Sequence, residues 1–240
     1  MPGTREYFIA LDAYFEKNYP YLLSFLELES LKGKTVLEIG LGSGFTLHHI
    51  AEVASNCYGV DISEKTVQLC KKRTEHFGLD IQLINASSTA IPLPDNSIDV
   101  VVSIGCLHHI PEIQLAVDEI YRLLKPGGYL KGMVYNRNSW RFLIFIPILR
   151  RLHPRWRKKH WQECVNELYD GIGNPYGMVY SKTEVRHLLK RFTDIRFQVE
   201  NFVGGEIAPI IGGTIPRNFW LQTMGKIAGL DLYFAAKKAE

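Results

Sequence analysis

Residues 36–51, "VLEIGLGSGFTLHHIA", crowd three glycines between an apolar run and a helix-like pattern. The glycines are Gly40, Gly42 and Gly44. A glycine-rich turn between a strand and a helix presents backbone N–H groups to a ligand, and the absence of Cβ atoms lets the ligand approach closely. A dinucleotide-binding fingerprint, G-x-G-x-x-G, would need glycine at position 45, where Phe45 stands. Glu38 adds a carboxylate, which suits an ammonium group better than a pyrophosphate.

The first 135 residues alternate short apolar runs with helical patterns. The apolar runs predict strands over residues 35–39, 57–62, 81–85, 98–104 and 129–135. Helices are predicted over 45–54 and 63–77, the second with Ser63 as its N-cap and Gly78 just past its end. Apolar residues at 113, 117, 120 and 124 indicate a further helix, which "KPGG" ends. Such alternation is typical of βαβ units and predicts an α/β fold with a parallel sheet.

Regular patterns return after residue 180. The stretch "SKTEVRHLLKRF" predicts a helix that opens with a capping box formed by Ser181 and Glu184. Apolar residues at 195, 197 and 199 alternate as in a half-buried strand, and "DLYFAAKK" predicts a last strand over 231–238. A connection rich in Gly and Pro, residues 203–217, separates these two strands. Together with the earlier runs, they make seven predicted strands.

The composition favours one soluble domain. A chain of 240 residues with 46% hydrophobic residues can bury a sizeable core. Its longest apolar run, residues 142–149, is far shorter than the roughly 20 residues that cross a bilayer, and early acidic residues argue against a signal peptide. The four cysteines form no C-x-x-C pair, which argues against a disulfide framework and a zinc site. We therefore expect a cytoplasmic protein without a bound metal.

A second acidic residue closes the predicted strand over 57–62. Asp61 stands in "YGVDIS", 17 residues after Gly44. At this position a carboxylate can accept hydrogen bonds from both hydroxyls of a ribose. Helix capping is the alternative for an isolated aspartate, but the preceding glycine turn favours ribose binding. The sequence therefore predicts a nucleoside site.

Four stretches resemble, in order, the successive motifs of class I S-adenosylmethionine-dependent methyltransferases. They are "VLEIGLGSG", "GVDIS", "STAIPLPDNSIDVVVSIGCLHHIPE" and "LLKPGGYL". The match covers about residues 30–136, and its longer context resembles the small-molecule branch of the superfamily. The resemblance implies S-adenosylmethionine as cofactor. It also implies a Rossmann-like fold: a seven-stranded, mostly parallel sheet with an antiparallel last strand and helices on both faces.

The resemblance assigns cofactor-binding roles to individual residues. The glycine turn would lie under the methionine part of the cofactor, with Glu38 and Gly40 near its amino group. Asp61 would take the ribose diol, and Ile62 would pack on the adenine. The other expected contacts are Ser87 and Ser88 at the adenine edge, Ile104 and Gly105 along the sulfur, and Tyr14 and Tyr19 as a lid.

Two of these assignments have particular consequences. Ser87 and Ser88 stand where the family usually has an acidic residue followed by a small one. A neutral hydroxyl makes a weaker hydrogen bond than a carboxylate, so modest cofactor affinity is expected. For Tyr14 and Tyr19, aromatic packing against the core is the alternative to a lid.

Methyl transfer is an in-line displacement, so the protein must align the acceptor in a site that excludes water. A base is needed only where the acceptor loses a proton. His108 is the first candidate for a base or a positioning group; the alternative is that "LHHIP" caps a helix and walls the pocket, and His109 is expected to support the loop. The other acceptor-side candidates are Tyr135 and Tyr176, proposed as catalytic, and Asn136, Asp170, Asn174 and Tyr180. Loop structure is the alternative for each of them.

Residues 139–161, "SWRFLIFIPILRRLHPRWRKKHW", form a basic aromatic segment within the stretch 120–162, which has eleven Lys or Arg and no Asp or Glu. Peripheral contact with an anionic membrane is one interpretation. Others are a lid over the acceptor, a homodimer contact, or a helical insertion with a solvated basic rim, which the sequence favours. The net charge of only +3 argues against nucleic acid as a partner.

These observations predict a single methyltransferase domain over residues 1–240. Its parts are a helical lid over 1–30, a cofactor-binding core over 31–136, an acceptor-side helical insertion over 137–180, and a C-terminal helix and strands over 181–240. The expected function is methyl transfer to a small-molecule or lipid-like acceptor, at oxygen, nitrogen or carbon in that order. The alternatives are a non-catalytic nucleoside-binding protein and an RNA methyltransferase.

Overall fold

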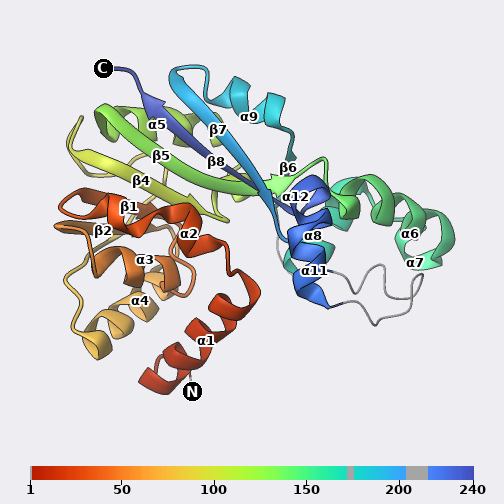
Figure 1. Cartoon of the computed structure of the whole chain (residues 1–240), viewed down its shortest axis with the longest axis horizontal. Coiled ribbons are helices and arrows are strands. Elements are labelled where there is room, and N and C mark those ends of the chain that lie inside the picture. Colours follow the sequence, from red (N-terminus) through yellow and green to blue (C-terminus); the bar gives the residue numbers. More distant parts are fainter. Residues whose placement is uncertain (1, 172–175, 204–215) are drawn as a thin grey trace.

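A mixed sheet runs through the computed structural model, which describes residues 2–171, 176–203 and 216–240. Its order is β3-β2-β1-β4-β5-β8-β7, with the short β6 beside β5 (Figure 1). The strands are β1 (Thr35–Ile39), β2 (Asn56–Asp61), β3 (Gln82–Asn85), β4 (Ile98–Ile104), β5 (Leu124–Asn136), β6 (Val179–Tyr180), β7 (Phe192–Glu200) and β8 (Asp231–Lys238). Only β8 runs against the others, because it pairs antiparallel with both β5 and β7.

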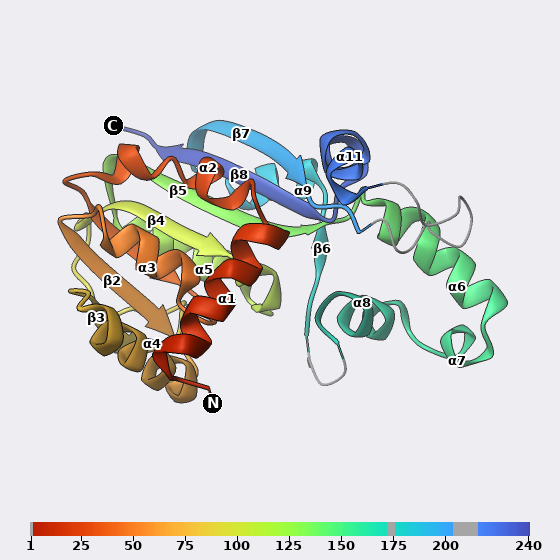
Figure 2. The same cartoon turned by 60° about the horizontal axis from the view of Figure 1, so that its bottom comes forward.

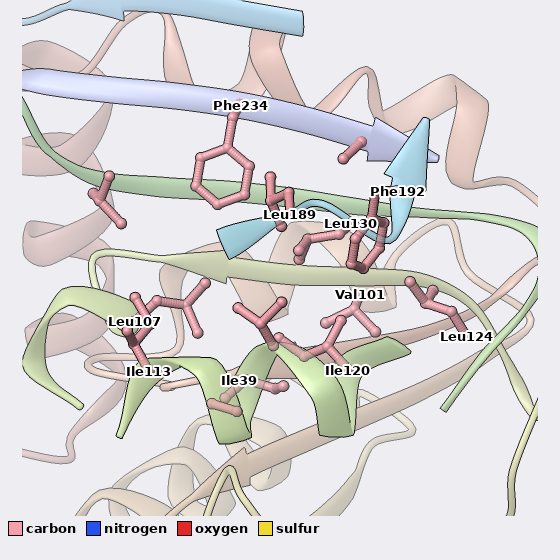
Figure 3. Close-up of a cluster of buried hydrophobic side chains, with 14 of the residues drawn as sticks. Ile39, Val101, Leu107, Ile113, Ile120, Leu124, Leu130, Leu189, Phe192 and Phe234 are labelled. Atoms are coloured by element: carbon pink, nitrogen blue, oxygen red, sulfur yellow. The ribbon is translucent and has the colours of Figure 1, made fainter. Parts of the chain in front are cut away.

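Helices cover both faces of this sheet. One face carries the early helices α1 (Arg5–Asn18), α2 (Leu22–Leu26), η1 (Leu28–Leu31), α3 (Phe45–Ala51) and α4 (Glu64–Phe77). The other face carries α5 (Ile113–Leu123) and α9 (Lys182–Leu188). Successive residues of a strand point to opposite faces, so Val36 packs with the early helices, whereas Leu37 and Ile39 pack with α5 and α9. Figure 3 shows the second of these cores, in which Ile120 of α5, Leu189 at the end of α9 and Phe234 of β8 belong to one buried cluster.

Local signals place the helix ends as expected from the sequence. The Ser63 side chain accepts from Thr66 N–H at the start of α4, and Gly78 closes that helix with a φ of 65°. Ser181 and Glu184 form a capping box at the start of α9. Each serine side chain accepts from a backbone N–H group of the first turn, which has no acceptor within the helix.

The first helix is held against α3 and α4 by a buried arginine. Arg73 is 2% exposed and donates to Asp12 at 2.6 Å. Its guanidinium also lies 4.7 Å from the centre of the Phe8 ring. Further along α1, Phe15 stacks on Phe45 with 5.0 Å between ring centres.

The segment after β5 projects from one side of the sheet as a helical insertion (Figures 1 and 2). It comprises the π-helix η3 (Arg141–Phe145), α6 (Ile146–Leu152), α7 (Pro154–Arg157) and α8 (Trp161–Asp170). A small core of its own, centred on Ile146, Trp156 and Cys164, holds these helices together. Within the ranges given above, no helix is long and apolar enough to cross a membrane.

The predicted α/β fold with seven main strands is confirmed, with four main corrections. The helix predicted over 45–54 ends at Ala51. The fifth strand starts at Leu124 rather than at 129, because "KPGG" forms an irregularity within β5 and not a turn before it. A short strand, β6, lies in the segment predicted to be helical. Two helices between β7 and β8, α11 (Arg217–Gln222) and α12 (Met224–Ala228), were not predicted.

Candidate active site

A cavity of about 280 Å³ opens at the carboxyl ends of β1, β2, β3 and β4. The strand order reverses between β1 and β4, and ligands of open α/β sheets bind at such a switch point. Residues from all four strand ends share the walls. They are Ile39, Gly40, Val60, Asp61, Ile62, Ala86, Ser87, Ser88, Thr89, Cys106, His109, Ile110, Pro111 and Glu112.

Asp61 fixes the shape of the cavity through its carboxylate. One oxygen accepts from Leu41 N–H at 2.9 Å, and the other accepts from Ser63 N–H at 2.8 Å. These bonds tie the glycine turn after β1 to the end of β2. Each carboxylate oxygen can accept a further hydrogen bond, so the group can still receive two donors from a ligand.

The glycine turn passes very close to the loop after β4. A Cβ atom on Gly40 would lie 2.3 Å from the Cβ atom of Cys106, and Gly40 has a φ of 82°. Both facts require glycine at this position. Gly42 differs, because a Cβ atom there would meet no atom within 4 Å.

Glu38 lies beneath the turn and is 2% exposed. Burial raises the pKa of its carboxyl group well above the usual range, and the nearby Asp61 carboxylate adds to this rise. Thr46 and the Leu47 N–H hydrogen-bond to the carboxyl group, but Oε2 has no partner in the described part of the chain. A buried acceptor without a donor fits a ligand that brings an ammonium group.

The adenine end expected from the sequence also faces this cavity. Ile62 is 77% exposed although it is apolar, and it lines the cavity together with Ser87 and Ser88. The Ser87 hydroxyl hydrogen-bonds to the Thr89 hydroxyl at 2.8 Å. Five of the twelve residues expected to bind the cofactor therefore share one cavity: Gly40, Asp61, Ile62, Ser87 and Ser88.

The other seven do not line this cavity. Glu38 is buried below the turn, and Gly44 is the N-cap of α3, where a Cβ atom would lie 3.1 Å from Cys70 Sγ. The remaining members are Gly42 on the surface of the turn, the partly buried Ile104 at the end of β4, Gly105, whose N–H donates to the Met133 carbonyl oxygen, and Tyr14 and Tyr19 on and after α1. Tyr14 is exposed and Tyr19 packs on Phe15, so their role as a lid stays a prediction.

Comparison with known proteins identifies the domain that forms this cavity. Residues 37–131 match the model of the methyltransferase domain family. The ubiquinone biosynthesis O-methyltransferase of Thiobacillus denitrificans is 32% identical over 118 residues, which are 48% of this chain and 50% of that protein. The phthiotriol/phenolphthiotriol dimycocerosates methyltransferase of Mycobacterium tuberculosis is 28% identical over 72% of this chain and 62% of that protein. The chain thus spans about half to three fifths of the length of these curated relatives.

These matches support the assignment of residues 37–131 to the class I S-adenosylmethionine-dependent methyltransferases. The fold of the chain agrees with this. A solved S-adenosylmethionine-dependent methyltransferase from Aquifex aeolicus superposes with a TM-score of 0.58 at 19% identity, covering 93% of this chain and 92% of the other. The antiparallel β8 between β5 and β7 is the arrangement that the resemblance implied.

Beside this cavity lies a polar cluster at the end of β5. The Tyr135 hydroxyl donates to Asp170 Oδ1, and the same oxygen lies 3.7 Å from His109 Nε2. His109 Nδ1 donates to the Tyr176 carbonyl oxygen at 2.7 Å, because a carbonyl can only accept. Burial and the hydrogen bond to Asp170 raise the pKa of Tyr135 well above its ordinary value, so the phenol stays protonated.

His108 lies behind this cluster and is fully buried. Its ring packs on Tyr135, with 3.9 Å between ring centres, and on His109, with 4.1 Å. Burial lowers the pKa of His108 well below its ordinary value, so the ring is neutral. Its position suits a group that orients Tyr135 and His109 rather than one that reaches the cavity.

Sequence reasoning gave His109 a supporting role, whereas the structure places it in the cavity wall and in the polar cluster at once. Two adjacent histidines cannot be told apart by sequence, because the turn of η2 (Leu107–His109) decides which one faces out. Of the other candidates, Asn136 is buried and donates to the Gly229 carbonyl oxygen, and Tyr180 of β6 packs against the main core. Asn174 lies outside the described residues. Those residues contain no cluster of His, Cys, Asp and Glu that could hold a metal ion.

Proposed function

We propose that this methyltransferase transfers the methyl group of S-adenosylmethionine to a hydroxyl oxygen of a small or lipid-like acceptor. The cavity at the ends of β1 and β2 carries the proposal, because it combines the close glycine turn, the Asp61 carboxylate and the exposed Ile62. The names of two relatives support oxygen and a lipid-like acceptor: one is an O-methyltransferase of ubiquinone biosynthesis, and the other a methyltransferase of phthiotriol dimycocerosates.

Different residues would bind different parts of the cofactor. Asp61 would accept from the two ribose hydroxyls while it keeps its backbone donors, and Ile62 would cover the adenine. Glu38 Oε2 would accept from the amino group of the methionine part. When bound, S-adenosylmethionine supplies an electrophilic methyl group on a sulfonium. Ile104, Gly105 and the glycine turn would exclude water from that end of the site.

The polar cluster after β5 would receive the acceptor. The Asp170 carboxylate accepts from the Tyr135 phenol and lies beside the His109 imidazole, so the cluster can hold the proton that a hydroxyl acceptor releases. His108 would position the two rings. The Tyr176 carbonyl would fix the tautomer of His109 by accepting from Nδ1.

Acceptor turnover tests this proposal. We expect release of S-adenosylhomocysteine, with a mass gain of one methyl group, from a pool of phenols, quinols and lipid alcohols. Asp170→Asn and Tyr135→Phe should each lower kcat by on the order of 10²-fold, because general acid–base groups typically contribute that much or more. Cofactor affinity should stay unchanged in both variants. Cofactor binding without methylation of any compound in the pool would instead support a non-catalytic nucleoside-binding protein. Methylation of RNA alone would support an RNA methyltransferase.

The proposal also covers the partners of the chain. A lipid-like acceptor resides in a membrane, so peripheral contact through residues 139–161 would bring the enzyme to it. A homodimer contact through the same residues is the competing interpretation.

A further inference from the structure

One face of the helical insertion exposes apolar side chains at helical spacing. Ile144, Ile148 and Leu152 are 39%, 46% and 75% exposed, and each follows the previous one by four residues along η3 and α6. Leu143, which is 54% exposed, widens the stripe. Four neighbouring apolar side chains in water mark an interaction surface rather than scattered surface residues.

Cations without partners border this apolar stripe. Arg151, Arg157 and Lys158 are exposed and make no ion pair within the described ranges. Arg155 and Lys159 differ, because both pair with Glu167. An open hollow of about 570 Å³ is lined by Arg150, Arg151, Leu152 and Arg157, that is, by three arginines and one leucine. We call the four apolar residues together with Arg151, Arg157 and Lys158 the docking face.

The insertion presents this face as a rigid unit. Ile146 and Trp156 turn inward and pack with Cys164 of α8, which leaves the opposite side of α6 outward. Arg150 stacks on Trp161 with 4.5 Å between its Cζ atom and the ring centre. The helices α6 and α7 lie at the far end of the insertion, away from the main sheet (Figure 2).

The combination fits one partner better than the others. An apolar stripe with a cationic rim matches the boundary of a bilayer, where apolar side chains enter the acyl region and cations meet anionic headgroups. A nucleic acid would use the cations but leave the exposed leucine and isoleucines in water. A second copy of the chain would bring the same positive charges against one another.

We propose that the docking face binds the surface of a membrane that contains anionic phospholipid. This inference names the lipid partner of the function proposed above. It depends on no cofactor or acceptor, so its failure would leave methyl transfer untouched. The polar cluster at Tyr135 and Asp170 flanks the insertion at both of its ends, so docking would place the acceptor side of the enzyme near the bilayer.

Vesicle flotation of the full chain tests the proposal. We expect binding to vesicles of phosphatidylcholine mixed with phosphatidylglycerol, and at least tenfold weaker binding to phosphatidylcholine alone. Replacing Arg151, Arg157 and Lys158 together by Gln should weaken binding to anionic vesicles on the order of 100-fold, since each cation near such a surface is worth about fivefold. Leu152→Ser should weaken it about tenfold.

Matched controls lie on other helices. Lys65, Lys71 and Lys72 are exposed on α4, and their joint replacement by Gln removes the same charge elsewhere. Leu115→Ser on α5 matches Leu152→Ser, because Leu115 is 55% exposed. All variants should keep the unfolding temperature and the calorimetric cofactor affinity of the parent chain.

Three results would overturn the proposal. One is equal binding to neutral and anionic vesicles, or none to either. Another is an equal loss of binding in the controls on α4 and α5. The third is a different partner. Light scattering could show a dimer that Leu152→Ser dissociates, or the chain could bind RNA but not vesicles and lose RNA binding when the three cations are replaced.

Discussion

The Asp61 carboxylate has two roles. It accepts hydrogen bonds that fix the glycine turn, and it is proposed to bind the ribose. Asp61→Asn keeps one oxygen acceptor but loses the charge, and hydrogen bonds to charged groups contribute about 1.5–3 kcal/mol. We therefore expect cofactor affinity to fall by about 10- to 100-fold in calorimetry. The unfolding temperature should fall less than in Asp61→Ala, because one of the two backbone N–H groups keeps an oxygen acceptor. Asp61→Ala should also lower the unfolding temperature, because two backbone N–H groups lose their acceptor. Asp80→Asn, on the surface, is the control; unchanged affinity in Asp61→Asn would refute the ribose assignment.

Substitution by alanine should affect two glycines of the same turn differently. Gly40→Ala brings a Cβ atom within 2.3 Å of Cys106, whereas Gly42→Ala meets open space. Both positions have positive φ, which costs about 1–2 kcal/mol for a residue with a Cβ atom. Gly40→Ala should therefore lose about 3 kcal/mol or more in urea unfolding, and Gly42→Ala only about 1 kcal/mol. Equal losses would show that the contact with Cys106 can relax freely.

At the scale of elements, an ion pair between a buried arginine and a partly buried aspartate helps to hold α1. Asp12→Asn would leave the Arg73 guanidinium, 2% exposed, without its charged partner. Breaking such a pair typically costs about 3–5 kcal/mol. Because α1 makes few other polar contacts, we expect the helix to detach before the sheet unfolds. Hydrogen exchange should then accelerate over residues 5–18 and stay slow in β1 and β4; uniform acceleration would show that α1 unfolds together with the rest.

The ends of β5, β7 and β8 meet at a buried acid. Asp231 pairs with Tyr135 and Glu200 across the sheet, and burial raises its pKa from 3.8 to about 7. Between these values the folded chain keeps a proton that the unfolded chain releases. The free energy of unfolding should therefore fall as pH rises through this window, by on the order of 4 kcal/mol, and level off above about pH 7.

Asp231→Asn isolates this effect, because the amide does not titrate and can still accept from Tyr21. In urea unfolding, the stability of the variant relative to the parent should rise between about pH 4.5 and about pH 8. A constant difference across this range would show that Asp231 keeps an ordinary pKa in the folded chain.

Helices and strands with a clear hydrophobic pattern could be predicted from the sequence. Clusters formed by contacts between distant segments could not. The strands β1 and β4 match their predicted ranges, because buried parallel strands are continuous apolar runs. The helices α11 and α12 were missed because each has only five or six residues, too few for a periodic signal. Glycine spacing predicted the turn after β1, of which Gly40 lines the cavity, whereas its contacts with the cofactor stay a prediction. The cluster of His109, Tyr135 and Asp170 joins three segments, and no local pattern shows such a meeting.

At the scale of the whole molecule, the two halves of the proposed reaction lie on one edge of the sheet. The cofactor cavity sits at the ends of β1 and β2, and the polar cluster sits at the end of β5, on the other side of β4. The insertion follows β5 directly, so its helices extend the acceptor side and not the cofactor side (Figure 1). Membrane contact would therefore affect acceptor delivery and leave cofactor binding alone.

This separation predicts how salt should affect turnover. Raising ionic strength from about 0.1 M to about 1 M shortens the screening length from about 10 Å to about 3 Å and weakens attraction between exposed cations and a surface. For an acceptor carried in anionic vesicles, the apparent KM should rise about tenfold or more, while kcat at saturation changes little. A water-soluble acceptor of the same chemistry, and the KM for S-adenosylmethionine, should show no such rise. The variant in which Gln replaces Arg151, Arg157 and Lys158 should already show a high KM for the acceptor in vesicles at low salt. An equal salt effect on both acceptors would place the charge dependence in the active site instead of on the docking face.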